Sequence, residues 1–162
     1  MRDSIGGIPV IVIVTLFIVI ALGYVAFNVN YTKAFRMKNK AIDLFEDFYG
    51  AERCKSNGRC TAKLKDYAES IGYNPGKLDC SHIPGADNVV GLVCYTTGTY
   101  DTYTAEERKT LGIVDEGQGT FYNKVYAMIN IDIPIIKNMV MTMDTFYVSG
   151  TTSSIKTINA HK

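Results

Sequence analysis

The chain has 162 residues, of which 17 are lysine or arginine and 16 are aspartate or glutamate, so its formal net charge is +1. The basic residues are spread along the chain, which argues against the dense basic surface of a nucleic-acid-binding protein. Two histidines are present, and GxSxG, HExxH, P-loop and GxGxxG patterns are not. We therefore expect no enzyme, no cofactor and neither a nucleic-acid nor a small-molecule partner.

Residues 8–27, IPVIVIVTLFIVIALGYVAF, form an apolar stretch without a charged residue. A helix of this length measures about 30 Å, which matches the hydrocarbon core of a bilayer. Pro9 is expected in the first turn, where its missing N–H is tolerated. The pattern predicts a transmembrane helix. Two alternatives stay open: a buried core helix, and a secretory signal cleaved after the small-x-small sequence Ala21-Leu22-Gly23.

Residues 28–50 continue the helical pattern with apolar residues mostly three or four positions apart. These residues are Tyr31, Ala34, Phe35, Ala41, Ile42, Leu44, Phe45, Phe48 and Tyr49. Gly50 is a typical helix stop. We expect one helix of roughly forty residues, transmembrane in its first half and amphipathic in its second. This continuity argues against cleavage behind the span.

The four cysteines lie in residues 51–162, which we expect to form one small extracellular α+β domain. An even number of cysteines in a small domain is typical of an oxidising compartment and predicts two disulfides. Three connectivities are open, and we favour Cys54 with Cys60 and Cys80 with Cys94. A zinc site with His82 and free cytosolic thiols are the alternatives.

The basic run in residues 33–40, just after the predicted span, favours the opposite location for the domain. By the positive-inside rule it favours a cytoplasmic location for the C-terminal side of the span, because only Arg2, offset by Asp3, precedes the span. The rule is statistical, and we give the cysteines more weight. The expected location is therefore the cell membrane, with a single pass and the C-terminal domain outside.

Two short helices are predicted in the domain. The first begins at Thr61 and ends before Gly72. The second begins at Thr104, because Thr104 and Glu107 have the spacing of a capping box, and ends near Leu111. The acidic residues at 106, 107, 115 and 116 could suggest a calcium-binding loop, but they lack its alternating pattern of aspartates. We favour a solvent-exposed helix start. The tyrosines at 95, 100 and 103 are expected at a sheet edge or subunit contact rather than in a ligand-binding cluster.

Three strands are predicted. Residues 89–95 are an apolar run typical of a buried strand, whereas residues 125–133 and 140–148 alternate with a period of two. Pro134 should end the second strand, and Ser149-Gly150-Thr151 should form a turn or bulge before an extension over residues 154–158. We expect this small antiparallel sheet to cover the apolar stripe of the long helix, which gives an α+β fold.

The chain resembles type IV pilin-like proteins, and it is most similar to the TadE-like pseudopilins of bacterial tight-adherence (Tad) pilus systems. The resemblance rests on the N-terminal span with its early Pro9, the basic continuation YTKAFRMKNK, and the C-terminal segment INIDIPIIKNMVMTMDTFYVSGTT. It implies a pilin-like fold and a structural role in a surface filament or in its membrane assembly machine. The implied partners are membrane lipid, other pilin-like subunits and assembly proteins.

The resemblance also implies roles for four residues near the N-terminus. Prepilin leaders are cut after a glycine, so residues 1–7 are either a leader cut between Gly7 and Ile8 or a short cytoplasmic tail. In a filament the spans bundle, and Ala21 and Gly23 would then permit close helix packing. The alternative function is a membrane-anchored extracellular binding or adhesin domain that never polymerises.

Overall fold

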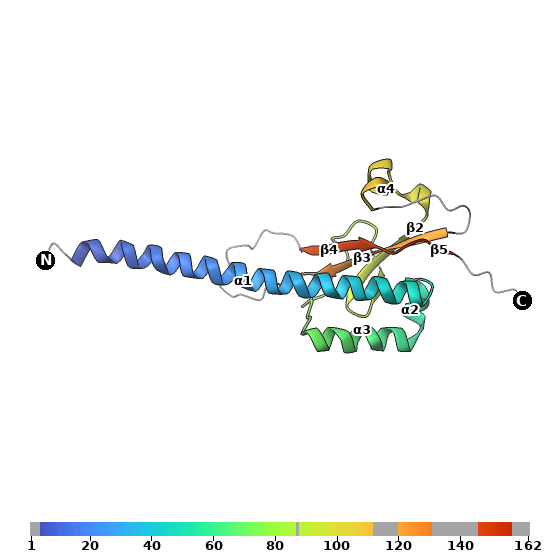
Figure 1. The fold of residues 1–162 in the computed structure, drawn as a ribbon, viewed down its shortest axis with the longest axis horizontal. Helices are drawn as coiled ribbons and strands as arrows, with labels where there is room; N and C mark the ends of the chain where they lie inside the picture. The colour runs from blue at the N-terminus through green and yellow to red at the C-terminus, as the bar shows by residue number, and fades with distance from the viewer. Residues whose placement is uncertain (1–3, 87, 112–119, 131–145, 157–162) are drawn as a thin grey trace, which may run out of the picture.

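The computed structural model describes residues 4–86, 88–111, 120–130 and 146–156. A long helix leads into a small domain in which further helices and an antiparallel sheet surround its second half (Figure 1). The elements are α1 (Ser4–Asp47), α2 (Ala51–Ser56), α3 (Gly58–Ile71), β1 (Asn88–Val90), β2 (Val93–Gly98), the 3₁₀ helix η1 (Tyr100–Thr102), α4 (Ala105–Leu111), β3 (Thr120–Met128), β4 (Tyr147–Thr151) and β5 (Ile155–Lys156). The α+β arrangement of a long apolar helix with a small antiparallel sheet is therefore confirmed.

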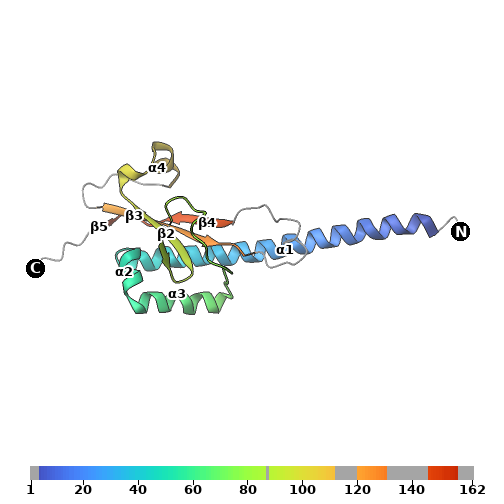
Figure 2. The same cartoon turned by 180° about the vertical axis from the view of Figure 1, so that it is seen from behind.

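Helix α1 is unbroken over 44 residues and projects far beyond the domain at its N-terminal end (Figures 1 and 2). It begins at Ser4, so the expectation that Pro9 lies in the first turn is wrong. The helix ends at Asp47 in a Schellman-type turn, in which the Gly50 N–H donates to the Phe45 carbonyl at 2.7 Å. Tyr49 takes the left-handed position of this turn, with φ 56°.

The sheet has the order β1-β2-β3-β4, with every pair antiparallel, and β5 pairs with the start of β3. The predicted strand over residues 89–95 is in fact a hairpin. Val90 pairs with Val93 across the two-residue loop Gly91-Leu92, and Gly91 has φ 59°. Glycine at the first loop position is typical of a tight hairpin turn, and it splits the apolar run into β1 and β2.

Strand β3 begins five residues before the predicted start at Val125 and ends at Met128. Its alternation is confirmed between Val125 and Ile129: the side chains of residues 125, 127 and 129 join the core beneath α1, while Tyr126 and Met128 join a second core on the opposite face. Both faces of β3 are therefore covered. Residues 131–145 lie outside the described residues. They include Pro134 and most of the strand predicted over residues 140–148.

The predicted turn at Ser149-Gly150-Thr151 is wrong, because these residues belong to β4 and pair with Tyr126, Val125 and Lys124. Gly150 packs closely on α1: a Cβ there would lie 3.0 Å from Ile42 Cδ1 and 3.0 Å from Lys38 Cδ, so the ends of these two side chains would have to shift. The glycine allows α1 to approach the sheet closely. The predicted extension is confirmed in part by β5, and residues 157–158 are outside the described part.

The core between α1 and the sheet contains the fully buried Met37, Phe45 and Tyr95. Phe45 and Tyr95 pack edge to face, with ring centroids 5.8 Å apart. The Tyr95 hydroxyl donates to Glu52 Oε1 at 2.6 Å, which joins β2 to α2. Tyr95 is thus a core residue, and its expected place at a sheet edge or subunit contact is wrong.

Helix α3 lies beside the second half of α1 (Figures 1 and 2) and buries Leu64 and Ala68. The predicted cap at Thr61 is wrong: Asn57 caps the helix by accepting the Arg59 N–H at 3.0 Å, so α3 begins at Gly58. An asparagine accepts this bond at the N-cap readily. The predicted end at Gly72 is confirmed by its left-handed conformation.

Helix α4 begins as predicted. The Thr104 N–H donates to Glu107 Oε2 at 3.0 Å, and the Glu107 N–H donates to Thr104 Oγ1 at 3.3 Å. This is the reciprocal capping box, and the helix ends at Leu111 as expected.

The hairpin turn generates a first prediction. Gly91→Ala places a side chain at φ 59°, with its Cβ 3.3 Å from Leu64 Cβ, so we expect a loss of about 1 to 3 kcal/mol in the free energy of unfolding. The measurement is urea unfolding of the full chain in detergent micelles. Gly58→Ala is the matched control, because a Cβ at Gly58 meets nothing within 4 Å, and it should be neutral or slightly stabilising. Equal effects of the two substitutions would contradict the assigned turn.

Candidate functional site: the exposed apolar half of helix α1

The first half of α1 is apolar and uncovered. Among the described residues, this is the one helix long and apolar enough to cross a membrane, and only 6% of its most apolar 18-residue window is buried. Ile11 is 67% exposed and Phe17 is 72% exposed. A core helix of this domain would be buried, so that alternative is excluded. An apolar surface of this extent requires a cover of lipid or protein.

Polar groups in this half are satisfied within the helix. The Thr15 hydroxyl donates to the Ile11 carbonyl at 2.8 Å. Near the end of the apolar half, Asn28 Nδ2 donates to the Tyr24 carbonyl at 2.9 Å, and the Thr32 hydroxyl donates to the Asn28 carbonyl at 2.8 Å. Such local bonds meet the requirement of an apolar surrounding that polar groups find partners inside the segment.

Aromatic rings gather where the apolar half meets the domain. Tyr24 and Tyr31 are exposed, and the Phe27 ring stacks on Tyr31 at 6.3 Å and meets Phe146 edge to face at 6.2 Å. Tyrosines concentrate at membrane–water boundaries, where the ring is in an apolar layer and the hydroxyl is wet. Phe146 lies just before β4, so the domain contacts α1 at the position of these aromatic rings.

The first charged residue after Asp3 is Lys33, and it lies where the apolar half of α1 ends. Its ammonium donates to the Gly72 carbonyl at 3.0 Å, at the C-terminal end of α3. A cation at this end of a helix binds an otherwise unpaired carbonyl and complements the helix dipole. The contact ties α3 to α1 where the apolar half ends.

The basic run after the span is partly used in packing. Lys38 is 9% exposed, its ammonium lies 4.3 Å from the centroid of the Phe35 ring, and burial lowers its pKa. Lys33 is held by α3 as described. These lysines therefore have structural roles in the domain, which weakens their use as a sign of a cytoplasmic location.

The predicted N-terminal site residues lie on α1. The Gly7–Ile8 bond is within the first turns of the helix, and whether it is cleaved stays a prediction. Ala21 is exposed and Gly23 is buried. Residues two positions apart do not share a helix face, so the two would not contact the same neighbouring helix.

The cysteines are joined as the sequence analysis favoured. Cys54 bonds to Cys60 with a Cα–Cα distance of 5.2 Å and links α2 to α3. Cys80 bonds to Cys94 with a Cα–Cα distance of 5.9 Å and fastens the segment before β1 to β2. All four are buried and no described cysteine is free, so neither a thiolate zinc site nor a cysteine nucleophile is formed.

The Asp79-Cys80-Ser81-His82 sequence, which places a cysteine near a histidine, forms a turn. Asp79 Oδ1 accepts the Ser81 hydroxyl at 2.6 Å and the Ser81 N–H at 3.0 Å, and these bonds, with His82 and Lys77 nearby, lower the Asp79 pKa. His82 lies 3.6 Å from Asp79 Oδ2 on the surface. The group is a surface turn that positions Cys80 for its disulfide.

The acidic residues weighed as a calcium loop are accounted for in part. Glu107 belongs to the capping box, and its bonds to Thr104 lower its pKa. Glu106 lies in the first turn of α4, where a negative charge is favourable. Asp115 and Glu116 lie outside the described residues, and the described part contains no group of three or more metal-ligating side chains.

A hollow lies on the sheet face opposite α1, and we call it the outer-face groove. No sequence pattern indicated it. It has a volume of about 360 Å³, and its lining includes Gly85, Thr96, Tyr103, Lys124, Tyr126 and Tyr147. Burial and the neighbouring Tyr147, Tyr103 and Glu107 raise the Tyr126 pKa to about 12. The three tyrosines are at least 21 residues apart from one another in the sequence, so no local pattern connects them.

The disulfides generate a second prediction. Removing the Cys80–Cys94 bond with Cys80→Ala and Cys94→Ala should lower the free energy of unfolding by about 3 kcal/mol, because it frees a longer loop in the unfolded chain. The matched control is the Cys54→Ala and Cys60→Ala pair, whose shorter separation predicts about 2 kcal/mol. Urea unfolding under non-reducing conditions measures both. A smaller loss for the longer loop would contradict this account.

Comparison with protein-family models, with curated proteins and with solved structures finds no match for this chain. The features that bear on function are therefore those of its own residues: an uncovered apolar half-helix without a charge, an aromatic boundary, and a disulfide-bonded domain built directly on the second half of the same helix.

Proposed function

We propose that the protein is a structural, pilin-like or pseudopilin-like subunit, held in the cell membrane by the first half of α1 and carrying its domain outside the cell. The observation that supports this most is the continuity of α1, which is one helix through the apolar half, the aromatic boundary and the packed half. The domain is thus held rigidly on the span, as a filament subunit requires.

The membrane location is supported by dimensions and composition. Residues 8–27 are apolar on all sides and span about 30 Å, the thickness of a bilayer core. Tyr24 and Tyr31 would then lie near the headgroup layer, and Lys33 would lie in water. The two buried disulfides favour the oxidising side of the membrane for the domain.

Assembly would exchange one apolar surrounding for another. In the membrane, lipid tails cover the exposed residues of α1, and in a filament the spans of neighbouring subunits would cover them instead. Both surroundings are apolar, so the exchange has little hydrophobic cost, and close packing of helices drives association. The role is structural, and we propose no catalytic activity. An anchored binding domain differs in one respect only: its helix stays in lipid.

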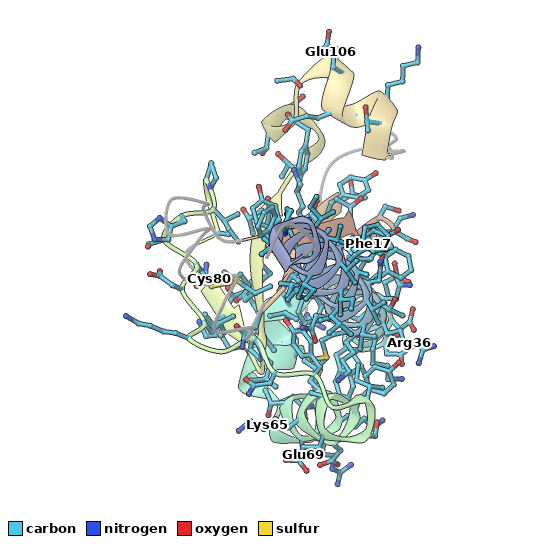
Figure 3. All side chains as sticks on the ribbon, turned by 90° about the vertical axis from the view of Figure 1, so that its left-hand side faces the viewer. Phe17, Arg36, Lys65, Glu69, Cys80 and Glu106 are labelled. Atoms are coloured by element: carbon cyan, nitrogen blue, oxygen red, sulfur yellow. A yellow bond between two sulfur atoms is a disulfide. The ribbon has the colours of Figure 1, made fainter. Side chains whose placement is uncertain are left out.

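The third prediction tests which molecules cover the helix. A photoreactive amino acid at Phe17, the exposed position in the middle of the span, should cross-link copies of this chain in sheared surface material from the source cells. The same residue at Lys65, on the side of α3 that faces away from α1 (Figure 3), is the control and should not give that adduct.

Cross-links at position 17 to lipid alone, with all of the chain in the membrane fraction, would contradict a filament subunit and establish the anchored domain. A soluble chain that lacks residues up to Gly23 would contradict both and establish a cleaved signal.

A further inference from the structure

The outer-face groove crosses the side of the sheet that α1 does not cover. Its floor is formed by outward-facing residues of β2, β3 and β4, among them Thr96, Lys124 and Tyr147. One wall is the segment around Gly85, which the Cys80–Cys94 disulfide holds against the sheet, and the other is formed by Tyr103 and Glu107. The volume of about 360 Å³ is in the range of small-ligand pockets.

Tyr103 is one of the residues that line this groove, and its hydroxyl is buried. The residue is 7% exposed, and its buried hydroxyl has no hydrogen-bond partner among the described residues. Burial and the nearby Glu107 carboxylate raise its pKa, so the hydroxyl keeps its proton at neutral pH. A buried hydroxyl without a partner is unfavourable, and a ligand oxygen that accepts its proton would satisfy it.

An aromatic pair supplies the apolar part of the groove. The rings of Tyr126 and Tyr147 meet edge to face with centroids 5.4 Å apart, and Tyr147 is 42% exposed. Lys124 Nζ lies 5.6 Å from the Tyr126 ring centroid. An exposed ring held by a buried one is a preformed platform for a flat apolar face.

The charged side chains that the structure describes in the groove favour a neutral ligand. The lining contains one cation, Lys124, and one anion, Glu107, so the formal charges cancel. Hydroxyl groups of Thr96 and Ser149 add polar atoms to the floor. The ligand that matches such a lining has an apolar C–H face for the rings and neutral hydroxyls for the polar atoms, which describes a sugar ring.

We propose that the outer-face groove binds a neutral sugar unit of a glycan, with its C–H face on Tyr147 and a ring or hydroxyl oxygen accepting the Tyr103 proton. The platform and the donor come from different elements, β4 and the residue after η1. The groove lies on the domain, opposite the face packed on α1, so binding does not depend on how the span is covered.

The fourth prediction uses three substitutions in the full chain, solubilised in a zwitterionic detergent that has no sugar headgroup. The probes are neutral glucan, galactan, mannan and chitin oligosaccharides, with polygalacturonate as the anionic comparison, and binding is measured by calorimetry. We expect at least one neutral probe to bind. Tyr103→Phe should weaken that binding roughly tenfold without lowering the urea midpoint, because it removes only an unpaired hydroxyl. Tyr147→Ala should weaken binding at least as much.

The matched control is Tyr67→Phe on α3, outside the groove, which should leave the affinity unchanged. The proposal is overturned if none of the neutral probes binds, if only polygalacturonate binds, or if Tyr103→Phe and Tyr147→Ala leave the affinity unchanged. Concentration-dependent dimerisation abolished by both substitutions, without sugar binding, would also overturn it and assign the groove to a contact between copies. None of these outcomes bears on the cross-linking at Phe17.

Discussion

The structure depends on one constraint: α1 is a single continuous helix whose first half is exposed and apolar and whose second half packs in the domain core. Residues 4–32 carry no charged side chain, whereas from Lys33 onward the same helix forms one side of the domain core. The change is sharp because Lys33 is fixed to the end of α3 and Phe27 to Phe146 beside β4. A flexible linker would let the domain move relative to the apolar half of the helix, but here one continuous helix carries both.

The second half of α1 packs on one face of the sheet, and the two disulfides hold α2, α3 and the segment before β1 in place. Gly150 lets the helix approach β4, while the Cys80–Cys94 bond draws the segment around Ile83 over Tyr126 and Met128. That segment covers only part of the outer face, and the uncovered part is the groove. A domain of this size has a modest core, so covalent links at both sides of the fold add to its stability.

Local physics made some of this structure predictable from the sequence. The long helix, the capping box at Thr104, the alternation of β3 and the favoured cysteine pairing each depend on residues close in sequence or on simple counting. Some errors were local, such as the hairpin turn at Gly91-Leu92 and the cap at Asn57, and others came where distant elements decide. Gly150 appeared to mark a turn, yet it lies in a strand that pairs with β3 and packs on α1. The groove could not be predicted, because Tyr103, Tyr126 and Tyr147 meet only through strand pairing.

The most direct test of the central claim, a membrane-held helix with an oxidised domain outside, is the non-reducing intact mass of the chain in the membrane fraction of its own cells. The account predicts a mass that includes residues 8–162 and is lower than the reduced mass by four hydrogen atoms, two for each disulfide. A chain in the soluble fraction without this deficit would contradict both the anchor and the outside location.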